Sequence, residues 1–335
     1  MRPTETTPLA AIPLAAIRAA RERIAGLALR TPLIRLDAPE APAEIWLKLE
    51  NLQPIGSFKL RGAGNALALA APEALARGAV TASAGNMAQG VAWAARARGV
   101  PCTVVMPEGA PATKRAAVER LGARIVALPY DVWWRVIETG RCDGIAGVGG
   151  GAGVFVHPVA DPDVIAGNGT IGLEILDDLP DVDAVLVPYG GGGLSCGIAS
   201  AVRALRPAAR VWACEVSTAA PLAASLAAGE PRAVERVPSF VDGIGGRSVL
   251  QAMWPLARAL LAGSLVVPLE EVAAAIRLLA ERARVVAEGA GAVAVAAALS
   301  GRAGRGKIVC VISGGNIDAA PLARILAGGL PEAPR

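Results

Sequence analysis

Four consecutive glycines, Gly190–Gly193, stand between an apolar run and a helical pattern in the stretch VLVPYGGGGLSCGIASAV. A strand that turns directly into a helix is typical of the βα unit of a parallel sheet. Without Cβ atoms, the backbone N–H groups can converge on an anion at the helix N-terminus, where the dipole adds attraction. The pattern favours a phosphate-binding turn over a merely flexible one. A dinucleotide site is a weaker alternative, because Ser195 stands where the third glycine of GxGxxG belongs.

The alternation of strand and helix patterns recurs along the chain. Further β-rich runs are EIWLKLE, AVTAS, CTVVMP, VWACEV and KIVCVISGGN. Helical patterns cover residues 13–25, 62–76, 85–99 and 269–287. This order predicts an α/β protein with two domains, each an open, mostly parallel twisted sheet with helices on both faces. A ligand is expected between the domains, at the carboxyl ends of strands. The glycine-rich stretch 144–153 is interpreted as a loop near a domain boundary.

Composition narrows the class of function. Hydrophobic residues make up 53% of the chain and aromatic residues 3%, which suits buried parallel strands flanked by alanine-rich helices. The net charge of +4 includes no basic block, so we expect no nucleic-acid partner. No long apolar window lacks charge, so we expect no membrane span. The five cysteines show no CxxC spacing, which indicates neither a disulfide framework nor a metal cluster and fits a cytoplasmic protein.

Three further elements carry polar groups that could meet one ligand. Lys59 lies in GSFKLRGAG; alone, such a lysine is usually a solvated charge. In TASAGNMAQG, the small residues Ser83, Ala84 and Gly85 expose backbone N–H groups suited to a carboxylate, and Asn86 adds an amide. Ser313 ends the strand in VCVISGGNID, where its hydroxyl could bond a ring nitrogen, although a turn-forming serine is the commoner role.

Taken together, the motifs resemble the fold-type II pyridoxal-phosphate enzymes, which share the tryptophan synthase β-like fold. The likeness is strongest to the threonine and serine dehydratases, or ammonia-lyases, without a regulatory domain. The motifs are RTPL, GSFKLRGA, TASAGNMAQGVA, HPVADPDVIAGNGTIGLEI, PYGGGGLSCGIA, VDGIGG, EGAGA and ISGGNID, in that order over nearly the whole chain. The resemblance implies a large cofactor-binding domain of residues 1–50 and 154–335 and a small substrate-loop domain of residues 51–153, with approximate boundaries. It also implies a homodimer or higher homo-oligomer.

The resemblance assigns roles to individual residues. Lys59 would form a Schiff base with pyridoxal 5'-phosphate, with Phe58 packed beside the ring. The phosphate would be held by Gly190, Gly191, Gly192, Gly193 and Leu194. Asn86 would meet the ring hydroxyl and Ser313 the pyridine nitrogen. The backbone of Ser83, Ala84, Gly85, Asn86 and Met87 would take the substrate carboxylate. Gly243 and Glu288 would lie near the ring.

The implied reaction is an α,β-elimination on threonine, serine or a related β-hydroxy amino acid. A desolvated lysine amine is a nucleophile and, once displaced, a base for the α-proton, while the cofactor takes up the electrons. The β-hydroxyl leaves, and the product hydrolyses to a 2-oxo acid and ammonia. A serine at the pyridine nitrogen would leave that nitrogen neutral and favour elimination over transamination.

Several residues depart from the family pattern. Ala84 stands where serine racemases carry a serine that acts on the opposite face, which favours a dehydratase. Met87 replaces the usual histidine. Glu215 matches a cation ligand of some relatives, but Pro221 stands where the aspartate is expected, so we predict no metal site. His157, the only histidine, is more often a satisfied structural residue than a catalytic one.

Other functions remain open on the sequence alone. Trp133 and Trp134 are by default core residues, but with Met87 they could fit a dehydratase to a bulkier 3-hydroxy amino acid. An amino-acid racemase, a β-replacement synthase, or a non-catalytic protein that binds pyridoxal phosphate or an amino acid are the other interpretations.

Overall fold

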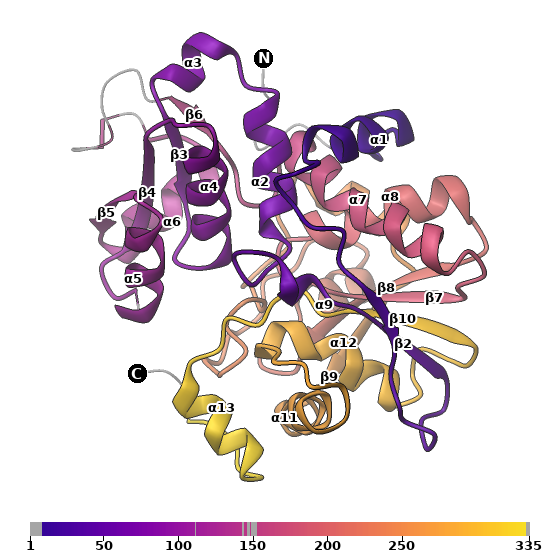
Figure 1. Cartoon of the computed structure of the whole chain (residues 1–335). Helices are drawn as coiled ribbons and strands as arrows, with labels where there is room; N and C mark the ends of the chain where they lie inside the picture. Colours follow the sequence, from indigo (N-terminus) through magenta and orange to yellow (C-terminus); the bar gives the residue numbers. More distant parts are fainter. Residues whose placement is uncertain (1–8, 111, 143, 146–147, 149–152, 333–335) are drawn as a thin grey trace.

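The computed structural model describes residues 9–110, 112–142, 144–145, 148 and 153–332. Within them the chain forms two sheets, a six-stranded sheet in the order β1-β2-β10-β7-β8-β9 and a four-stranded sheet in the order β5-β4-β3-β6. Figure 1 shows the smaller sheet at one side of the molecule and the larger sheet at the other, with α2 between them. The predicted α/β class, with mostly parallel sheets and helices, is confirmed.

The larger sheet combines strands from both ends of the chain. Its strands are β1 (Leu33–Arg35), β2 (Glu44–Lys48), β7 (Ala184–Pro188), β8 (Arg210–Val216), β9 (Ser264–Val267) and β10 (Lys307–Val311). Every pair is parallel except β1 with β2, which is antiparallel. Because β10 lies between β2 and β7, the turn after β10 meets chain from both halves of the sequence.

Helices cover both faces of the larger sheet. The helices are α1 (Leu14–Arg23), α7 (Pro162–Asp178), α8 (Gly193–Leu205), α9 (Pro221–Ala228), α10 (Trp254–Leu260), α11 (Leu269–Leu278), α12 (Gly289–Leu299) and α13 (Ala319–Leu326). Along β7, Val185 and Val187 pack in one apolar cluster with α1, α7, α8 and α10, whereas Ala184 and Leu186 pack in another with α11, α12 and α13. The alternation of side chains along a strand thus buries both faces.

The smaller sheet has the same layered build. Its strands are β3 (Ala79–Ala82), β4 (Cys102–Pro107), β5 (Arg124–Leu128) and β6 (Val154–Phe155), and all are parallel. The helices of this part are α2 (Lys59–Ala68), α3 (Pro72–Ala76), α4 (Asn86–Ala97), α5 (Ala112–Arg120) and α6 (Tyr130–Thr139). One apolar cluster joins the sheet to α2, α4 and α5, and a second joins it to α6.

Three sequence expectations need adjustment. The helix predicted over 62–76 is two helices, because Pro72 begins α3 after a break. The helix predicted over 269–287 ends in a π-helical turn at Ala283, where Arg284 takes a left-handed conformation with φ of 60°. The strand β6 pairs with β3, so residues 154–155 lie with the smaller sheet, just past the boundary placed at 153. The domain boundaries themselves stay a prediction, and much of the glycine-rich stretch 144–153 lies outside the described residues.

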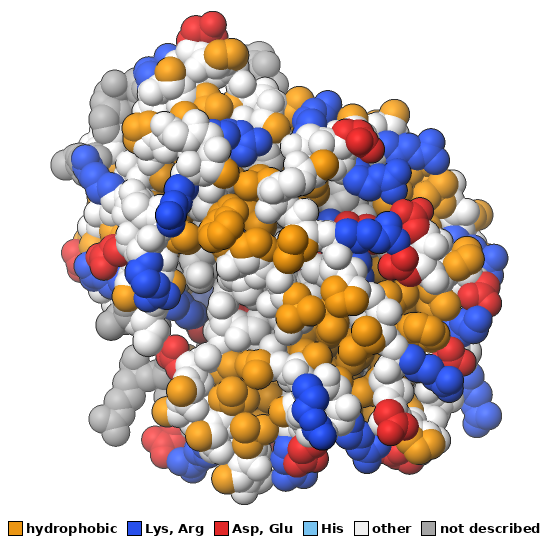
Figure 2. Space-filling model, viewed as in Figure 1, with side chains coloured by type: hydrophobic (Ala, Val, Ile, Leu, Met, Phe, Trp, Pro, Cys, Tyr) orange, Lys and Arg blue, Asp and Glu red, His pale blue; other side chains and the backbone are white. Residues whose placement is uncertain are grey.

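The surface carries mixed charge. Figure 2 shows Lys and Arg side chains interspersed with Asp and Glu side chains, and apolar side chains gathered across the middle of the same face. Among the described residues, no helix is both long enough and apolar enough to cross a bilayer.

Candidate active site

Lys59 is the first residue of α2, and the turn after β10 holds the chain just before it. The Phe58 N–H donates to the carbonyl oxygen of Ser313 at 3.1 Å, and Ser57 forms an isolated antiparallel bridge with Gly314. These backbone contacts join segments that lie far apart in the sequence. The structure therefore brings together the lysine and the serine that the sequence singled out.

The Lys59 amine lies in a partly buried position. Its Nζ donates to the carbonyl oxygen of Pro158 at 3.3 Å and lies 5.0 Å from the centre of the Phe58 ring. Burial lowers the pKa of Lys59 from 10.5 to about 8, although the nearby Glu288 carboxylate opposes this shift. A larger share of the amine is therefore neutral and nucleophilic near neutral pH than for an exposed lysine.

Neighbouring residues pack closely against the glycine loop between β7 and α8. A Cβ on Gly191 would lie 2.5 Å from the Cγ2 of Val159, and a Cβ on Gly193 would lie 2.9 Å from the Val159 carbonyl oxygen. Gly192 has a φ of +95°, a conformation that favours glycine. The Nδ2 of Asn168 also donates to the Gly193 carbonyl oxygen at 3.3 Å. The loop therefore requires glycine, and its position at the start of α8 suits an anion.

The Asn86 amide is held at both ends. Asn86 is the first residue of α4; its Nδ2 donates to the Oε1 of Glu288 at 2.8 Å, and its Oδ1 accepts from the Nδ2 of Asn316 at 2.8 Å. The Asn316 Nδ2 also donates to the carbonyl oxygen of Ile55 at 2.9 Å. The orientation of Asn86 is thus fixed, with one amide hydrogen left for a ligand.

Glu288 lies at the centre of the site. Burial raises the pKa of its carboxyl to about 7, and the charge of Asp242 adds to the rise, while the Asn86 hydrogen bond opposes it. A Cβ on Gly314 would lie 2.4 Å from the Glu288 Oε1, and one on Gly243 would lie 3.5 Å from the same atom. Glu288 thus contacts the Asn86 amide and lies against Gly314 of the turn after β10, and Gly243 lies close to the Glu288 carboxyl.

An ion pair near Glu288 joins the smaller and larger parts of the molecule. Lys114 of α5 pairs with Asp242, which precedes Gly243 in a loop of the larger part. Both charges influence the pKa of Glu288, in opposite directions. The carboxyl therefore lies where the small and large parts of the molecule meet.

The loop at residues 83–87 begins α4. The Ser83 hydroxyl accepts from the Gly85 N–H at 3.2 Å, which shapes the turn. The Met87 side chain is 2% exposed and packs in the apolar cluster with α2 and α5. Met87 can therefore contribute only its backbone to this loop, and its side chain is a core residue.

Trp133 and Trp134 pack on α6 against the smaller sheet. Their ring centres lie 6.1 Å apart, and Tyr130 lies 5.5 Å from Trp133 and 6.4 Å from Trp134. Both indoles are partly buried against the cluster that includes Val105 and Val136. Core packing, the default interpretation of these residues, agrees with this position.

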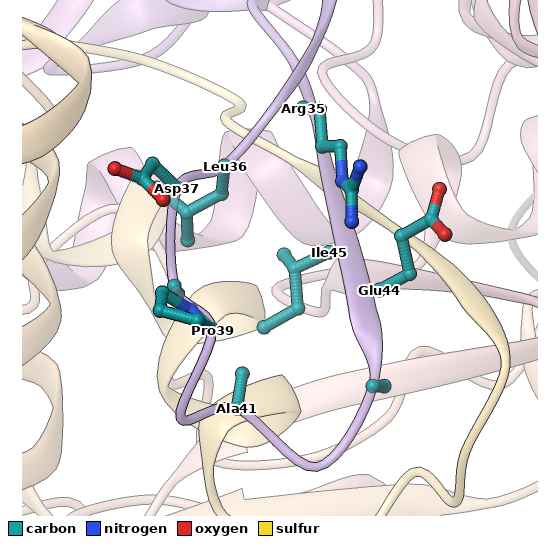
Figure 3. A pocket seen from close by; sticks show the side chains of 9 residues that line it. Arg35, Leu36, Asp37, Pro39, Ala41, Glu44 and Ile45 are labelled. Carbon is teal, nitrogen blue, oxygen red and sulfur yellow. The ribbon is translucent and has the colours of Figure 1, made fainter.

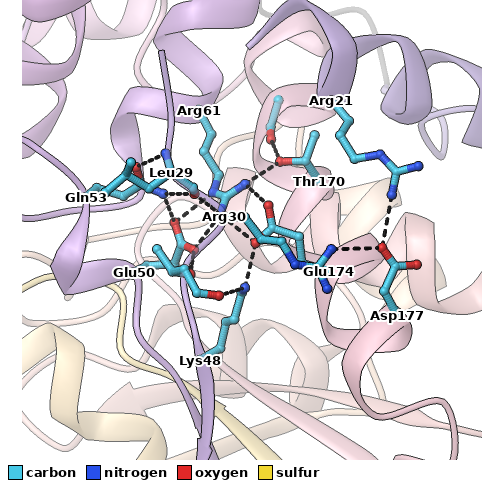
Figure 4. A network of polar contacts seen from close by, with 12 residues as sticks. Arg21, Leu29, Arg30, Lys48, Glu50, Gln53, Arg61, Thr170, Glu174 and Asp177 are labelled. Atoms are coloured by element: carbon cyan, nitrogen blue, oxygen red, sulfur yellow. Dashed lines mark hydrogen bonds and ion pairs between the residues drawn. The ribbon is translucent and has the colours of Figure 1, made fainter. Parts of the chain in front are cut away.

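A buried ionic network, which the sequence did not reveal, anchors α2 (Figure 4). Arg61 donates to Glu50 at 2.8 Å and to Glu174 of α7 at 2.6 Å, and Lys48 donates to Glu174 at 2.5 Å. All four side chains are at most 5% exposed. The only available signal was charge within apolar stretches, such as LRGAG and GLEIL. Because Arg61 follows Lys59 by two residues, the network fixes the helix that presents the amine.

Glu215, the predicted match to a cation ligand, is engaged elsewhere. Its carboxylate accepts from the Leu222 N–H at 2.9 Å, the Ala223 N–H at 2.8 Å and the Ser264 hydroxyl at 2.6 Å. The carboxylate thus caps the start of α9. Within the part of the chain that is described, no three His, Cys, Asp or Glu side chains are grouped as metal ligands.

A separate hollow lies at the hairpin between β1 and β2 (Figure 3). Arg35, Asp37, Glu44 and Ile45 are among its lining residues. None of the predicted site residues lines it, so it is distinct from the site around Lys59.

Comparison with known proteins gives the family. The profile of the family described as "Pyridoxal-phosphate dependent enzyme" matches residues 24–314. The chain belongs to this pyridoxal-phosphate-dependent family. The match confirms both the predicted family and the predicted cofactor.

Relatives within the pyridoxal-phosphate family are dehydratases and racemases. The L-threonine ammonia-lyase of Thermotoga maritima is 45% identical over 294 residues, which are 87% of this chain and 72% of that protein. The solved threonine deaminase isoform 2 of Solanum lycopersicum has a TM-score of 0.84 at 30% identity, covering 97% of this chain and 91% of that one. Maize serine racemase has a TM-score of 0.82 at 33% identity, covering 95% of this chain and 98% of that one.

The residues present fit pyridoxal phosphate. The partly buried Lys59 amine supplies a nucleophile, and the glycine loop, packed closely against Val159, leads into the N-terminus of α8, where backbone N–H groups can bind an anion. Ser57, beside Phe58, is buried, and its Oγ has no partner among the described residues. A phosphate, an aldehyde and a polar ring would therefore each find a matching group at this site.

Proposed function

We propose that this protein is a pyridoxal-phosphate-dependent ammonia-lyase. It acts by α,β-elimination on threonine, serine or a related β-hydroxy amino acid, and it yields a 2-oxo acid and ammonia. The observation that carries the proposal is the Lys59 amine, whose pKa is lowered to about 8, held at 3.3 Å from Pro158 beside the glycine loop. The identity of 45% to an L-threonine ammonia-lyase supports this choice of reaction.

We propose the following cofactor contacts. Lys59 binds the cofactor covalently, and the N–H groups of Gly190–Gly193 and Leu194 hold its phosphate. Asn86 directs its remaining amide hydrogen at the ring oxygen, because Glu288 and Asn316 occupy its other positions. Ser313 offers a neutral hydroxyl to the pyridine nitrogen, as expected for elimination.

Proton transfer is the task of Lys59. Bound pyridoxal phosphate supplies an electron sink for the substrate Cα. The neutral Lys59 amine takes the proton from Cα, and the electron pair forms the Cα–Cβ double bond as the C–O bond at Cβ breaks. The leaving hydroxyl accepts one proton, which balances the proton taken from Cα, and departs as water. Addition of water to the released enamine then expels ammonia and leaves the 2-oxo acid. The carbonyl oxygen of Pro158 accepts an N–H of Lys59 and so orients the amine.

The substrate carboxylate binds the start of α4 in this proposal. The backbone of residues 83–87 lies at the N-terminus of the helix, where N–H groups attract an anion. Ala84 offers no hydroxyl on this loop, so a second acid or base for racemisation is missing there. Met87 and the two tryptophans pack in apolar clusters, which gives no support to a pocket for bulkier substrates.

We further propose a cytoplasmic homo-oligomer, with a dimer as the smallest form. Leu29, Leu52 and Val286 are 52%, 49% and 46% exposed. Hydrogen bonds bring their neighbourhoods together, from the Leu29 N–H to Gln53 and from Asn51 to the Val286 carbonyl. A patch of this kind suits a second copy of the chain. Sedimentation of the wild type and of Leu52→Glu tests the proposed homo-oligomer. A wild type that sediments as a monomer contradicts it.

A panel of β-hydroxy amino acids, assayed for ammonia and 2-oxo acid, tests the activity. The purified holoenzyme should release both products in equal amounts from threonine or serine, and Lys59→Ala should abolish release. Release only from larger substrates would contradict the threonine and serine assignment. Cofactor binding without any release would leave a binding protein and would refute the lyase.

A further inference from the structure

We propose that His157 is a positioning residue that sets one tight turn, residues 158–160, against both Lys59 and the phosphate-binding glycines. The inference rests on the proposed function, because it gives His157 a part in cofactor binding. It assigns no proton transfer to the imidazole. One side chain would therefore fix the two ends of the cofactor site, the amine and the anion cradle.

The imidazole holds the turn through its Nδ1 atom. The N–H of Val159 donates to the His157 Nδ1 at 3.0 Å, and the N–H of Ala160 donates to the same atom at 2.9 Å. An Nδ1 atom that accepts two hydrogen bonds carries no proton. The turn from Pro158 to Ala160 is thus closed by the side chain that precedes it.

The other ring nitrogen reaches α6, which packs against the smaller sheet. The Nε2 of His157 lies 3.1 Å from the carbonyl oxygen of Ile137, near the end of α6. Because Nδ1 is an acceptor, Nε2 carries the proton and donates to that carbonyl. Phe155 meets the imidazole edge to face, with ring centres 6.4 Å apart. Both nitrogens are therefore occupied, and neither is available to a substrate.

The turn touches both parts of the cofactor site. The Pro158 carbonyl oxygen accepts the Lys59 Nζ at 3.3 Å. The next residue, Val159, lies where side chains on Gly191 and Gly193 would collide with it, at 2.5 Å and 2.9 Å. A shift of the turn would therefore move the acceptor of the lysine and the wall of the glycine loop together.

The charge state of the ring agrees with this geometry. Burial lowers the pKa of His157 to about 4, and the positive charge of Lys59 lowers it further, while the Ile137 hydrogen bond opposes. The imidazole is therefore neutral over the range in which Lys59 titrates. A histidine that served as acid or base would need a pKa closer to the working pH.

Two variants separate positioning from acid–base catalysis. His157→Asn keeps an acceptor near the place of Nδ1 for the two N–H groups. His157→Phe keeps a ring and removes these two hydrogen bonds as well as the one from Nε2 to the Ile137 carbonyl oxygen. The measurement is the dissociation constant of pyridoxal phosphate from each apoenzyme, followed by absorbance, with the affinity for inorganic phosphate as a second readout. We expect His157→Phe to weaken cofactor binding by about tenfold or more and His157→Asn by about threefold or less. Equal losses in the two variants would overturn the proposal.

A third variant acts on the turn without touching the imidazole. Val159→Ala removes the methyl groups that pack against Gly191 and keeps the carbonyl oxygen beside Gly193, and we expect it to weaken phosphate and cofactor binding in the same direction as His157→Phe. Unchanged binding in Val159→Ala would contradict the proposed link between the turn and the glycines. Circular dichroism of each apoenzyme identifies a variant that has not folded. The variants that do fold then test the link between the turn and the glycines.

The pH profile gives an independent outcome. The wild-type kcat/KM should show no ionisation that His157→Asn removes. An ionisation near the usual histidine pKa of about 6.5, lost in both substitutions, would overturn the positioning role in favour of an acid or base. A wild type that binds the cofactor but releases no ammonia contradicts the proposed function instead, and leaves the binding test of His157 valid.

Discussion

The amide of Asn86 and the carboxyl of Glu288 share a hydrogen bond of 2.8 Å, although 202 residues separate them in the sequence. Asn86 begins a helix of the smaller sheet, and Glu288 directly precedes α12 of the larger part. The bond therefore crosses the line where the two parts meet, at the side of the proposed ring site. The Asn86 amide donates to this carboxyl and so favours its charged form, whereas burial raises the pKa of Glu288 to about 7.

Glu288→Gln should become relatively more stable than the wild type as pH rises. Burial raises the folded-state pKa of Glu288 from 4.5 to about 7, so the folded protein binds more protons than the unfolded chain between these values. The stability that Glu288 contributes is therefore fully present below pH 4.5 and is lost as pH rises through about 7. Glutamine does not titrate. The advantage of Glu288→Gln should grow by roughly 3 kcal/mol at most across this window.

Urea unfolding of the two apoproteins at several pH values measures this difference. The matched control is Glu40→Gln, whose carboxylate is exposed and paired with Arg282. A difference between wild type and Glu288→Gln that stays flat with pH would contradict the raised pKa.

The rate at which the apoenzyme binds the cofactor covalently should depend on how much of the Lys59 amine is neutral. The folded pKa of about 8 lies below the unfolded value of 10.5, so the neutral amine becomes available at lower pH than in a free lysine. The rate of covalent capture should rise about tenfold per pH unit below this pKa and level off above it. Stopped-flow absorbance follows the rate, and a midpoint near the ordinary lysine value would refute the assigned environment.

Arg61→Ala should destabilise the fold strongly. It leaves Glu50 and Glu174 buried without their main cation, and loss of one member of a buried ion pair costs about 3–5 kcal/mol. Arg282→Ala breaks a pair on the surface and should cost at most about 1 kcal/mol. Denaturant unfolding of both variants compares them. Similar small losses in the two would mean that the network does not anchor α2.

Gly191→Ala should weaken cofactor binding more than Gly190→Ala. The added Cβ would lie 2.5 Å from Val159 in the first case, and 3.5 Å from the Gly243 carbonyl oxygen, its nearest neighbour, in the second. Crowding of this kind costs about 1–3 kcal/mol. Because the collision is with the Val159 side chain, Val159→Ala should recover part of the loss in the double variant. Strict additivity of the two substitutions would contradict the contact.

Local motifs made part of the site predictable from the sequence. Lys59, the glycines at 190–193 and Ser313 each stand in a short pattern whose chemistry is read from neighbouring residues. The alternation of strand and helix likewise predicted parallel sheets, because the side-chain period reflects burial. The structure adds how the turn after β10 places Ser313 against Phe58, which no local pattern contains.

Contacts between distant segments could not be predicted in this way. Asn316 orients Asn86 across 230 residues, and Glu174 pairs with Arg61 across 113. The pairing of β6 with the smaller sheet also depends on tertiary contacts, since a strand of two residues carries almost no periodic signal. Met87 differs, because a methionine in a helical pattern is by default a core residue, and the structure confirms that its side chain lies in the core.

Reduction of the holoenzyme with borohydride, followed by peptide mapping, tests the covalent role of Lys59 most directly. The reagent fixes a cofactor bound through an imine to the amine that holds it. We predict one modified peptide, with the cofactor on Lys59, and no label after Lys59→Ala. Label on another lysine, or a protein that takes up no pyridoxal phosphate, would contradict this role.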